Sequence, residues 1–162
     1  MKLLIPTQKD FRFSQYTSDG LTLIRRMNPD EAYDPEMCFT VSFRMGNRAE
    51  NDRRTAYMNQ RFYQDDEDGG LIAIDKFNPD DLARMEIQMT LCGSDLEYPV
   101  GDDKFKALEF EQSGSVRKIK NEAEFKTWYG YFPTQWAREV YAACLEVNPE
   151  WGRTKRVSGS TS

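Results

Sequence analysis

The segment Asn121–Trp151 holds the densest group of large aromatic residues in the chain and its clearest helix boundaries. Asn121 is a suitable N-cap, because its side-chain oxygen can accept a backbone N–H of the first helical turn. Gly130 predicts the end of this helix through a left-handed conformation, and Pro133 fits the first position of a second helix. We expect the second helix to run from Thr134 to Val147. Because few residues join the two helices, they should be antiparallel or sharply angled neighbours.

Both predicted helices carry an apolar stripe. Phe125, Trp128 and Tyr129 have helical spacing, which places three rings on one face. Trp136 and Tyr141 belong to the stripe of the second helix. The stripes have two interpretations. They close the core of the protein, which is the usual fate of an amphipathic face, or they leave rings exposed that bind a partner.

Composition limits the class of protein. The 162 residues are 39% hydrophobic, which is enough for one folded domain with a core. No stretch approaches the roughly 20 apolar residues of a membrane span, and the start MKLLIP is too short for the apolar part of a signal peptide. We therefore expect a cytoplasmic protein. The formal net charge of −5 argues against general attraction to nucleic acid or to an anionic membrane.

The chain contains no histidine. This excludes Ser-His-Asp and Cys-His nucleophile arrangements and histidine-ligated metal sites. Cys38, Cys92 and Cys144 are far apart in sequence and are expected to be free thiols in a reducing compartment. We expect no catalytic residues, no metal site and no cofactor.

The first part of the chain favours β-structure. Strands are predicted at Leu3–Ile5, Thr7–Asp19, Gly20–Met27 and Cys38–Met45, with a turn at Asp19-Gly20. Asn47 can cap a helix from Arg48 to about Tyr63. The apolar face of this helix is thin. We interpret its basic residues as a solvated face balanced by acids; the residues concerned are Arg48, Arg53, Arg54 and Arg61, with Glu50 and Asp52.

The acidic segment 64–70 resembles a calcium loop only in part. Gln64 and Asp75 occupy the positions at which that loop requires Asp and Glu, so an acidic linker is the better interpretation. A short strand or extended link is predicted at 71–77. Asn78-Pro79 begins a helix to about Cys92 with Gly93 as its C-cap, although residues 85–91 also alternate as a strand would.

The predicted fold class is α+β. A small N-terminal antiparallel β-sheet with one helix precedes a mostly helical C-terminal half. We expect one domain over residues 1–152, divisible into a β-rich part (1–63) and a helical part (71–152). Residues 153–162 are expected to be a disordered tail.

The helix beginning NPDDLARM, its end at Cys92-Gly93 and the final EFKTWYGYFPTQWAREVYAACLEVNPEW resemble the tail assembly chaperones of long-tailed bacteriophages. The resemblance covers about Asn78–Trp151 and leaves out the β-rich first 45 residues. It implies a mainly helical protein without enzymatic activity that keeps the tape-measure protein, or another tail protein, soluble in the host cytoplasm or on the virion. Self-association is left open.

A client helix requires an apolar groove with adaptable side chains, which methionines and aromatic residues supply. We expect the groove to be lined by Met85, Met89, Phe125, Trp128, Tyr129, Trp136 and Tyr141. On this hypothesis, replacing Trp128 and Trp136 with Ala abolishes capture of the partner.

Two other classes remain. An acidic inhibitor or regulatory protein would dock on a basic surface through Asp65, Asp66, Glu67, Asp68, Asp102 and Asp103. A metal-dependent enzyme would use clustered carboxylates; the candidates are Asp75, Asp80, Asp81 and Glu86.

Overall fold

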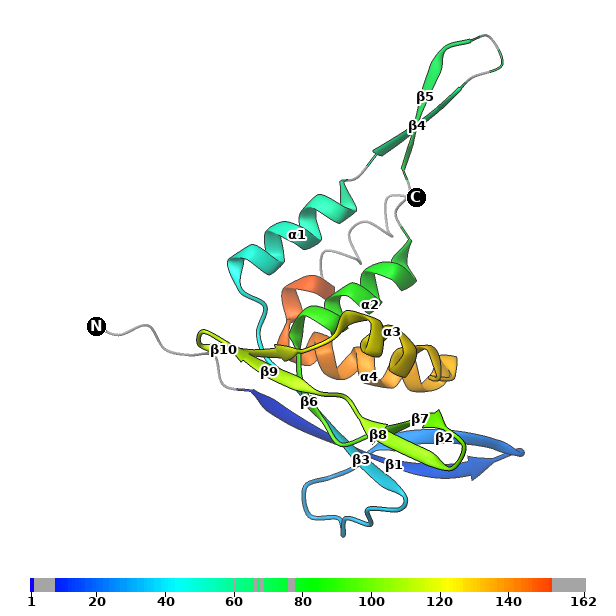
Figure 1. Ribbon diagram of the computed structural model, residues 1–162, viewed down its shortest axis with the longest axis vertical. Helices are drawn as coiled ribbons and strands as arrows, with labels where there is room; N and C mark the ends of the chain where they lie inside the picture. Colours follow the sequence, from blue (N-terminus) through cyan, green and yellow to red (C-terminus); the bar gives the residue numbers. More distant parts are fainter. Residues whose placement is uncertain (2–7, 60, 66, 68, 76–77, 153–162) are drawn as a thin grey trace.

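The computed structural model describes residues 1, 8–59, 61–65, 67, 69–75 and 78–152, with residues 61–65 and 71–75 described by their backbone alone. The predicted strand Leu3–Ile5 and the predicted tail 153–162 lie outside the described residues. The α+β class is confirmed, because a four-stranded antiparallel sheet packs against helices (Figure 1).

The main sheet has the strand order β2-β1-β3-β6, and every neighbouring pair is antiparallel. Its strands are β1 (Lys9–Ser18), β2 (Leu21–Arg26), β3 (Cys38–Phe43) and β6 (Leu91–Ser94). The predicted turn between β1 and β2 is confirmed: Asp19 and Gly20 both have positive φ, of 51° and 77°. Two residues with positive φ match the right-handed twist of the strands that they join.

The helices lie over one face of this sheet (Figure 1). They are α1 (Arg48–Met58), α2 (Pro79–Thr90), α3 (Glu122–Gly130) and α4 (Thr134–Val147). The core between the sheet and the helices is rich in phenylalanine. Its fully buried side chains include Phe13, Phe43, Ile87, Phe125, Trp128 and Val140.

Three hairpins complete the fold. They pair β4 (Arg61–Asp65) with β5 (Leu71–Asp75), β7 (Glu97–Gly101) with β8 (Lys104–Ala107), and β9 (Phe110–Ser113) with β10 (Val116–Ile119). The β4–β5 hairpin extends away from the body of the protein (Figure 1). The C-terminal half therefore combines its helices with short strands.

The predicted end of α1 was wrong. The helix stops at Met58 instead of about Tyr63, and residues 61–65 then pair with 71–75 as antiparallel strands. The acidic segment 64–70 thus includes the turn of a hairpin, where we predicted a linker. Aromatic and β-branched residues on both sides of Gly69-Gly70 favour cross-strand pairing over one more helical turn.

The choice of helix over strand for α2 was correct, and its predicted end was wrong. The helix ends at Thr90, and Gly93 lies in β6 opposite Ser42 instead of forming a C-cap. Here the sheet decides the boundary, because Leu91 pairs with Phe43 of β3. The expected left-handed end at Gly130 was also wrong: Gly130 is the last residue of α3 and does not have positive φ.

Side chains of α4 cover the outer edge of β2. The Ile24 N–H donates to Oε1 of Gln135 over 3.0 Å, and Nε2 of Gln135 donates to the Ile24 carbonyl over 2.7 Å. Nε1 of Trp136 donates to the Thr22 carbonyl over 3.1 Å. An uncovered edge would present free N–H and C=O groups to another chain. The Gln135 amide therefore replaces one residue of a neighbouring strand.

Replacing Gln135 with Ala should lower the free energy of unfolding by about 1–3 kcal/mol, because two backbone groups of Ile24 lose their partners. Urea denaturation measures this change. The matched control is Arg138→Ala, which alters an exposed residue of the same helix. Equal stability of the two variants would contradict the role of Gln135.

Candidate functional site

The predicted aromatic face closes the core. Phe125 and Trp128 are fully buried, and Nε1 of Trp128 donates to the Leu96 carbonyl over 3.1 Å. The Trp136 ring stacks on Phe39 of β3 with centroids 5.7 Å apart, and Tyr129 stacks on Phe125 at 5.6 Å.

The interpretation that these rings are exposed and bind a partner was therefore wrong for Phe125 and Trp128, because their own domain covers them. Replacing Trp128 and Trp136 with Ala removes core packing and does not isolate partner capture. Among the remaining predicted residues, Tyr141 donates from its hydroxyl to Oε2 of Glu86 over 2.6 Å. Met89 is buried and Met85 half-buried, and both lie on α2.

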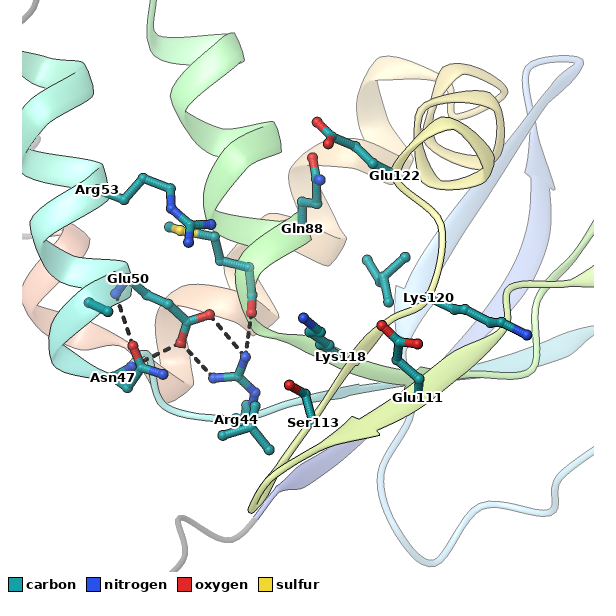
Figure 2. A pocket seen from close by; sticks show the side chains of 14 residues that line it. Arg44, Asn47, Glu50, Arg53, Gln88, Glu111, Ser113, Lys118, Lys120 and Glu122 are labelled. Atoms are coloured by element: carbon teal, nitrogen blue, oxygen red, sulfur yellow. Dashed lines mark hydrogen bonds and ion pairs between the residues drawn. The ribbon is translucent and has the colours of Figure 1, made fainter.

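These two methionines contribute to a groove beside α1. One hollow of about 410 Å³ lies between α1, α2 and the β9–β10 hairpin (Figure 2). A second hollow of about 620 Å³ is lined by Ala56, Tyr57 and Met85. The two hollows share lining residues and therefore adjoin one another, and together we call them the α1 groove. The shared residues are Arg53, Gln88, Met89 and Glu122.

The α1 helix is held in place by charged residues. Its buried side chains are Glu50 and Arg54, where the sequence predicted a solvated face. Nη1 and Nη2 of Arg44 donate to the Glu50 carboxylate over 2.6 and 2.9 Å, and Nη2 also donates to the Met89 carbonyl over 2.7 Å (Figure 2). Asn47 caps the helix as predicted and forms a capping box with Glu50. The Arg44 guanidinium binds both Glu50 of α1 and the Met89 carbonyl of α2, and so fixes the start of α1 against the end of α2.

A second buried pair fixes the middle of α1. Nε of Arg54 donates to Oε1 of Glu86 on α2 over 3.0 Å, and both side chains are buried. Nη2 of Arg54 donates to the Trp151 carbonyl over 3.0 Å, and Nε1 of Trp151 donates to Asn51 over 2.6 Å. Gly46 leaves room for this tryptophan, because a Cβ there would lie 2.6 Å from its ring. The C-terminal end of the described chain thus closes against α1.

The walls of the α1 groove carry cations from two elements. Arg53 of α1 and Lys118 of β10 lie on opposite sides of the hollow, whereas Lys120 is directed away from Arg53 (Figure 2). Within the described residues, neither Arg53 nor Lys118 forms an ion pair or a hydrogen bond. Three carboxylates also line the groove, and Glu50 among them is paired with Arg44.

This groove could not be predicted from the sequence, because its walls come from distant parts of the chain. The arginines of α1 were the available signal, and we interpret them from the sequence as an ordinary solvated face. The partner of Arg54 is 32 residues away in sequence, on α2. Helical spacing within α1 cannot identify such a partner.

The carboxylates proposed for a metal-dependent enzyme do not converge where they are described. Glu86 is engaged by Arg54 and Tyr141, while Asp80 and Asp81 lie in the first turn of α2. The side chain of Asp75 lies outside the described part. Across the described ranges, no three acidic or thiol side chains gather into a group that could hold a metal ion. No helix in the described part has the length and apolar character needed to cross a membrane.

Comparison with known proteins does not add an identity. No family model, no curated protein and no solved structure matches the chain.

Replacing Glu86 with Gln should lower the free energy of unfolding by about 3–5 kcal/mol, because Arg54 keeps a buried charge without its counter-ion. Chemical denaturation measures the loss. Glu122→Gln is the matched control: Glu122 lies 3.8 Å from Lys126 in an exposed pair, whose loss should cost less than about 1 kcal/mol. A cost for Glu86→Gln as small as that of the control would contradict this account of how α1 is held.

Stability should also fall at alkaline pH. Burial raises the pKa of the Cys92 thiol from 9.0 to about 11. The pKa of Tyr141 is also raised, mainly by burial and to a smaller extent by the hydrogen bond to Glu86. Each group therefore makes its full contribution to the free energy of unfolding at a pH below its pKa in the unfolded state. This contribution is lost as the pH rises through the pKa in the folded state. Between pH 9 and 11, Cys92→Ala should show a shallower decline of the unfolding free energy than the wild type, by up to about 1.4 kcal/mol per pH unit. If the unfolding free energies of the wild type and Cys92→Ala fell in parallel over this pH range, the assigned role of Cys92 would be contradicted.

Proposed function

We propose that the protein binds another polypeptide in the α1 groove and catalyses no reaction. The observation that carries the proposal is that two adjoining hollows lie along α1 and share Arg53, Gln88 and Met89. Adjoining hollows beside a helix suit a helix or an extended segment of a partner.

The lining of the groove has the mixed character of a binding surface. Met85 and Met89 offer flexible apolar side chains, which adapt to the shape of a partner. Ala49 and Ala56 are exposed on α1, seven residues apart and thus on the same face, so a partner backbone can approach the helix closely. Charged residues surround this apolar strip, as at the rim of many interfaces.

The resemblance to phage tail assembly chaperones indicates which partner to test first. On this proposal the protein holds the tape-measure protein, or another tail protein, in soluble form in the host cytoplasm before the tail is built. The aromatic residues of α3 and α4 then belong to the core, and Met85 and Met89 are the predicted partner-binding residues that line the groove.

The test is co-expression with the tape-measure protein of the same phage and recovery of the complex by affinity purification. Replacing Ala49 and Ala56 with Trp should fill the groove without disturbing the core, and should lower recovery of the partner at least tenfold. Ala142→Trp places the same ring on an exposed position of α4, outside the groove, and should leave recovery unchanged.

Recovery of a normal amount of partner by a folded Ala49→Trp/Ala56→Trp variant would contradict binding in the groove. Circular dichroism and the denaturation midpoint establish that the variant is folded. A complete absence of binding by the wild type to every tail protein of the phage would contradict the assembly role itself.

The arrangement of acidic turns favours one second candidate, an inhibitor that docks on a basic surface. Asp65 is the last residue of β4 and Glu67 lies in the connection to β5, and the β4–β5 hairpin extends away from the body (Figure 1). Asp102 and Asp103 form the turn between β7 and β8. Binding that survives the groove-filling substitutions and collapses with added salt would favour this candidate.

A further inference from the structure

The charges that line the α1 groove do not cancel within it. Arg44 and Glu50 neutralise one another, and Glu122 lies 3.8 Å from Lys126. Lys120 lies 3.6 Å from Glu109. The remaining groups are the cations Arg53 and Lys118 and a single carboxylate, Glu111, which is the cross-strand neighbour of Lys118. The groove therefore keeps a local positive excess in a protein with a formal net charge of −5.

The two cations flank an apolar surface. Arg53 comes from α1 and Lys118 from β10 (Figure 2), and Met89 of α2 also lines the groove. Val116 and Ile119 add apolar lining from the same hairpin. A ligand with an apolar group on the exposed part of Met89 and an anionic group near Arg53 and Lys118 therefore complements this part of the groove.

We propose that the α1 groove selects a polypeptide segment in which an acidic side chain stands next to a large apolar one. This inference rests on the proposed function and names the chemistry of the partner. The carboxylate lies between Arg53 and Lys118, and the apolar side chain packs on Met85 and Met89. A nucleic acid is disfavoured, because it would need many phosphate contacts from a protein that is acidic overall.

The acidic total gives this local excess a role in selection. An acidic segment is repelled by the net charge of the protein and attracted by the two cations of the groove, so placement at the groove is favoured. Because Arg53 and Lys118 have no partner within the described residues, no internal ion pair has to be broken when the carboxylate arrives. A partner carboxylate that binds here gives up hydrating water and gains contacts with the two cations.

A displayed library of random 12-residue peptides, selected on the purified full-length protein, tests the inference. The wild type should enrich peptides that carry Asp or Glu beside Leu, Ile, Met or Phe. The peptide enriched most strongly is then synthesised, labelled with fluorescein, and titrated by fluorescence polarisation. Charge reversal in Arg53→Glu/Lys118→Glu should weaken its affinity about tenfold, as expected for two partly solvated charge pairs.

The matched control is Lys104→Glu/Arg138→Glu, which makes the same change in net charge at exposed positions outside the groove. This control should change the affinity less than twofold. Replacing the acidic residue of the peptide with its amide should weaken binding to the wild type and have little effect on binding to the Arg53→Glu/Lys118→Glu variant.

The outcomes separate the inference from the function on which it rests. Enriched peptides that lack acidic residues, bind the wild type and do not bind the Ala49→Trp/Ala56→Trp variant would overturn the inference and leave the proposed function in place. An equal loss of affinity in the control variant would also overturn it, because a general charge effect would explain the binding. No enrichment of any peptide would overturn the inference and the proposed function together.

Discussion

The position of α1 depends on two buried ion pairs. This helix places Glu50 and Arg54 toward the interior, where most surface helices place apolar residues. Arg44 holds Glu50, and Glu86 of α2 holds Arg54. Such pairs add little net stability compared with apolar packing, but they penalise every arrangement in which one partner is left alone. They therefore fix the location of α1, and with it the width of the groove that α1 shares with α2 and the β9–β10 hairpin.

Much of the apolar surface in the rest of the fold is covered by the protein itself. The phenylalanine-rich face of the sheet is covered by helices, and the rings of α3 and α4 are packed into the same core. Gln135 and Trp136 occupy the outer edge of β2. The core face of the sheet and the outer edge of β2 are therefore not available to a partner. The α1 groove differs because it combines accessible methionine and alanine with cations that have no counter-ion inside the described structure.

Local signals in the sequence predicted local structure well. Asn47, Asn78 and Asn121 cap helices as expected, and Asp19-Gly20 forms the expected turn, because each effect depends on neighbouring residues. The ends of α1 and α2 were mispredicted, since the residues that follow these helices pair as strands, β4 with β5 and β6 with β3. The groove could not be predicted for the same reason. Met85 and Met89 were identified from composition, whereas Arg53 and Lys118 are brought together by the fold.

Hydrogen–deuterium exchange, measured on the protein alone and with the tape-measure protein proposed as its partner, tests the central claim most directly. If the partner occupies the α1 groove, the amides of residues 48–58 and 116–119 should exchange more slowly in the complex, while those of β1 and β2 remain unchanged. Slower exchange restricted to residues 61–75 or 97–107, with α1 unaffected, would contradict the account and move the interface to the acidic hairpins.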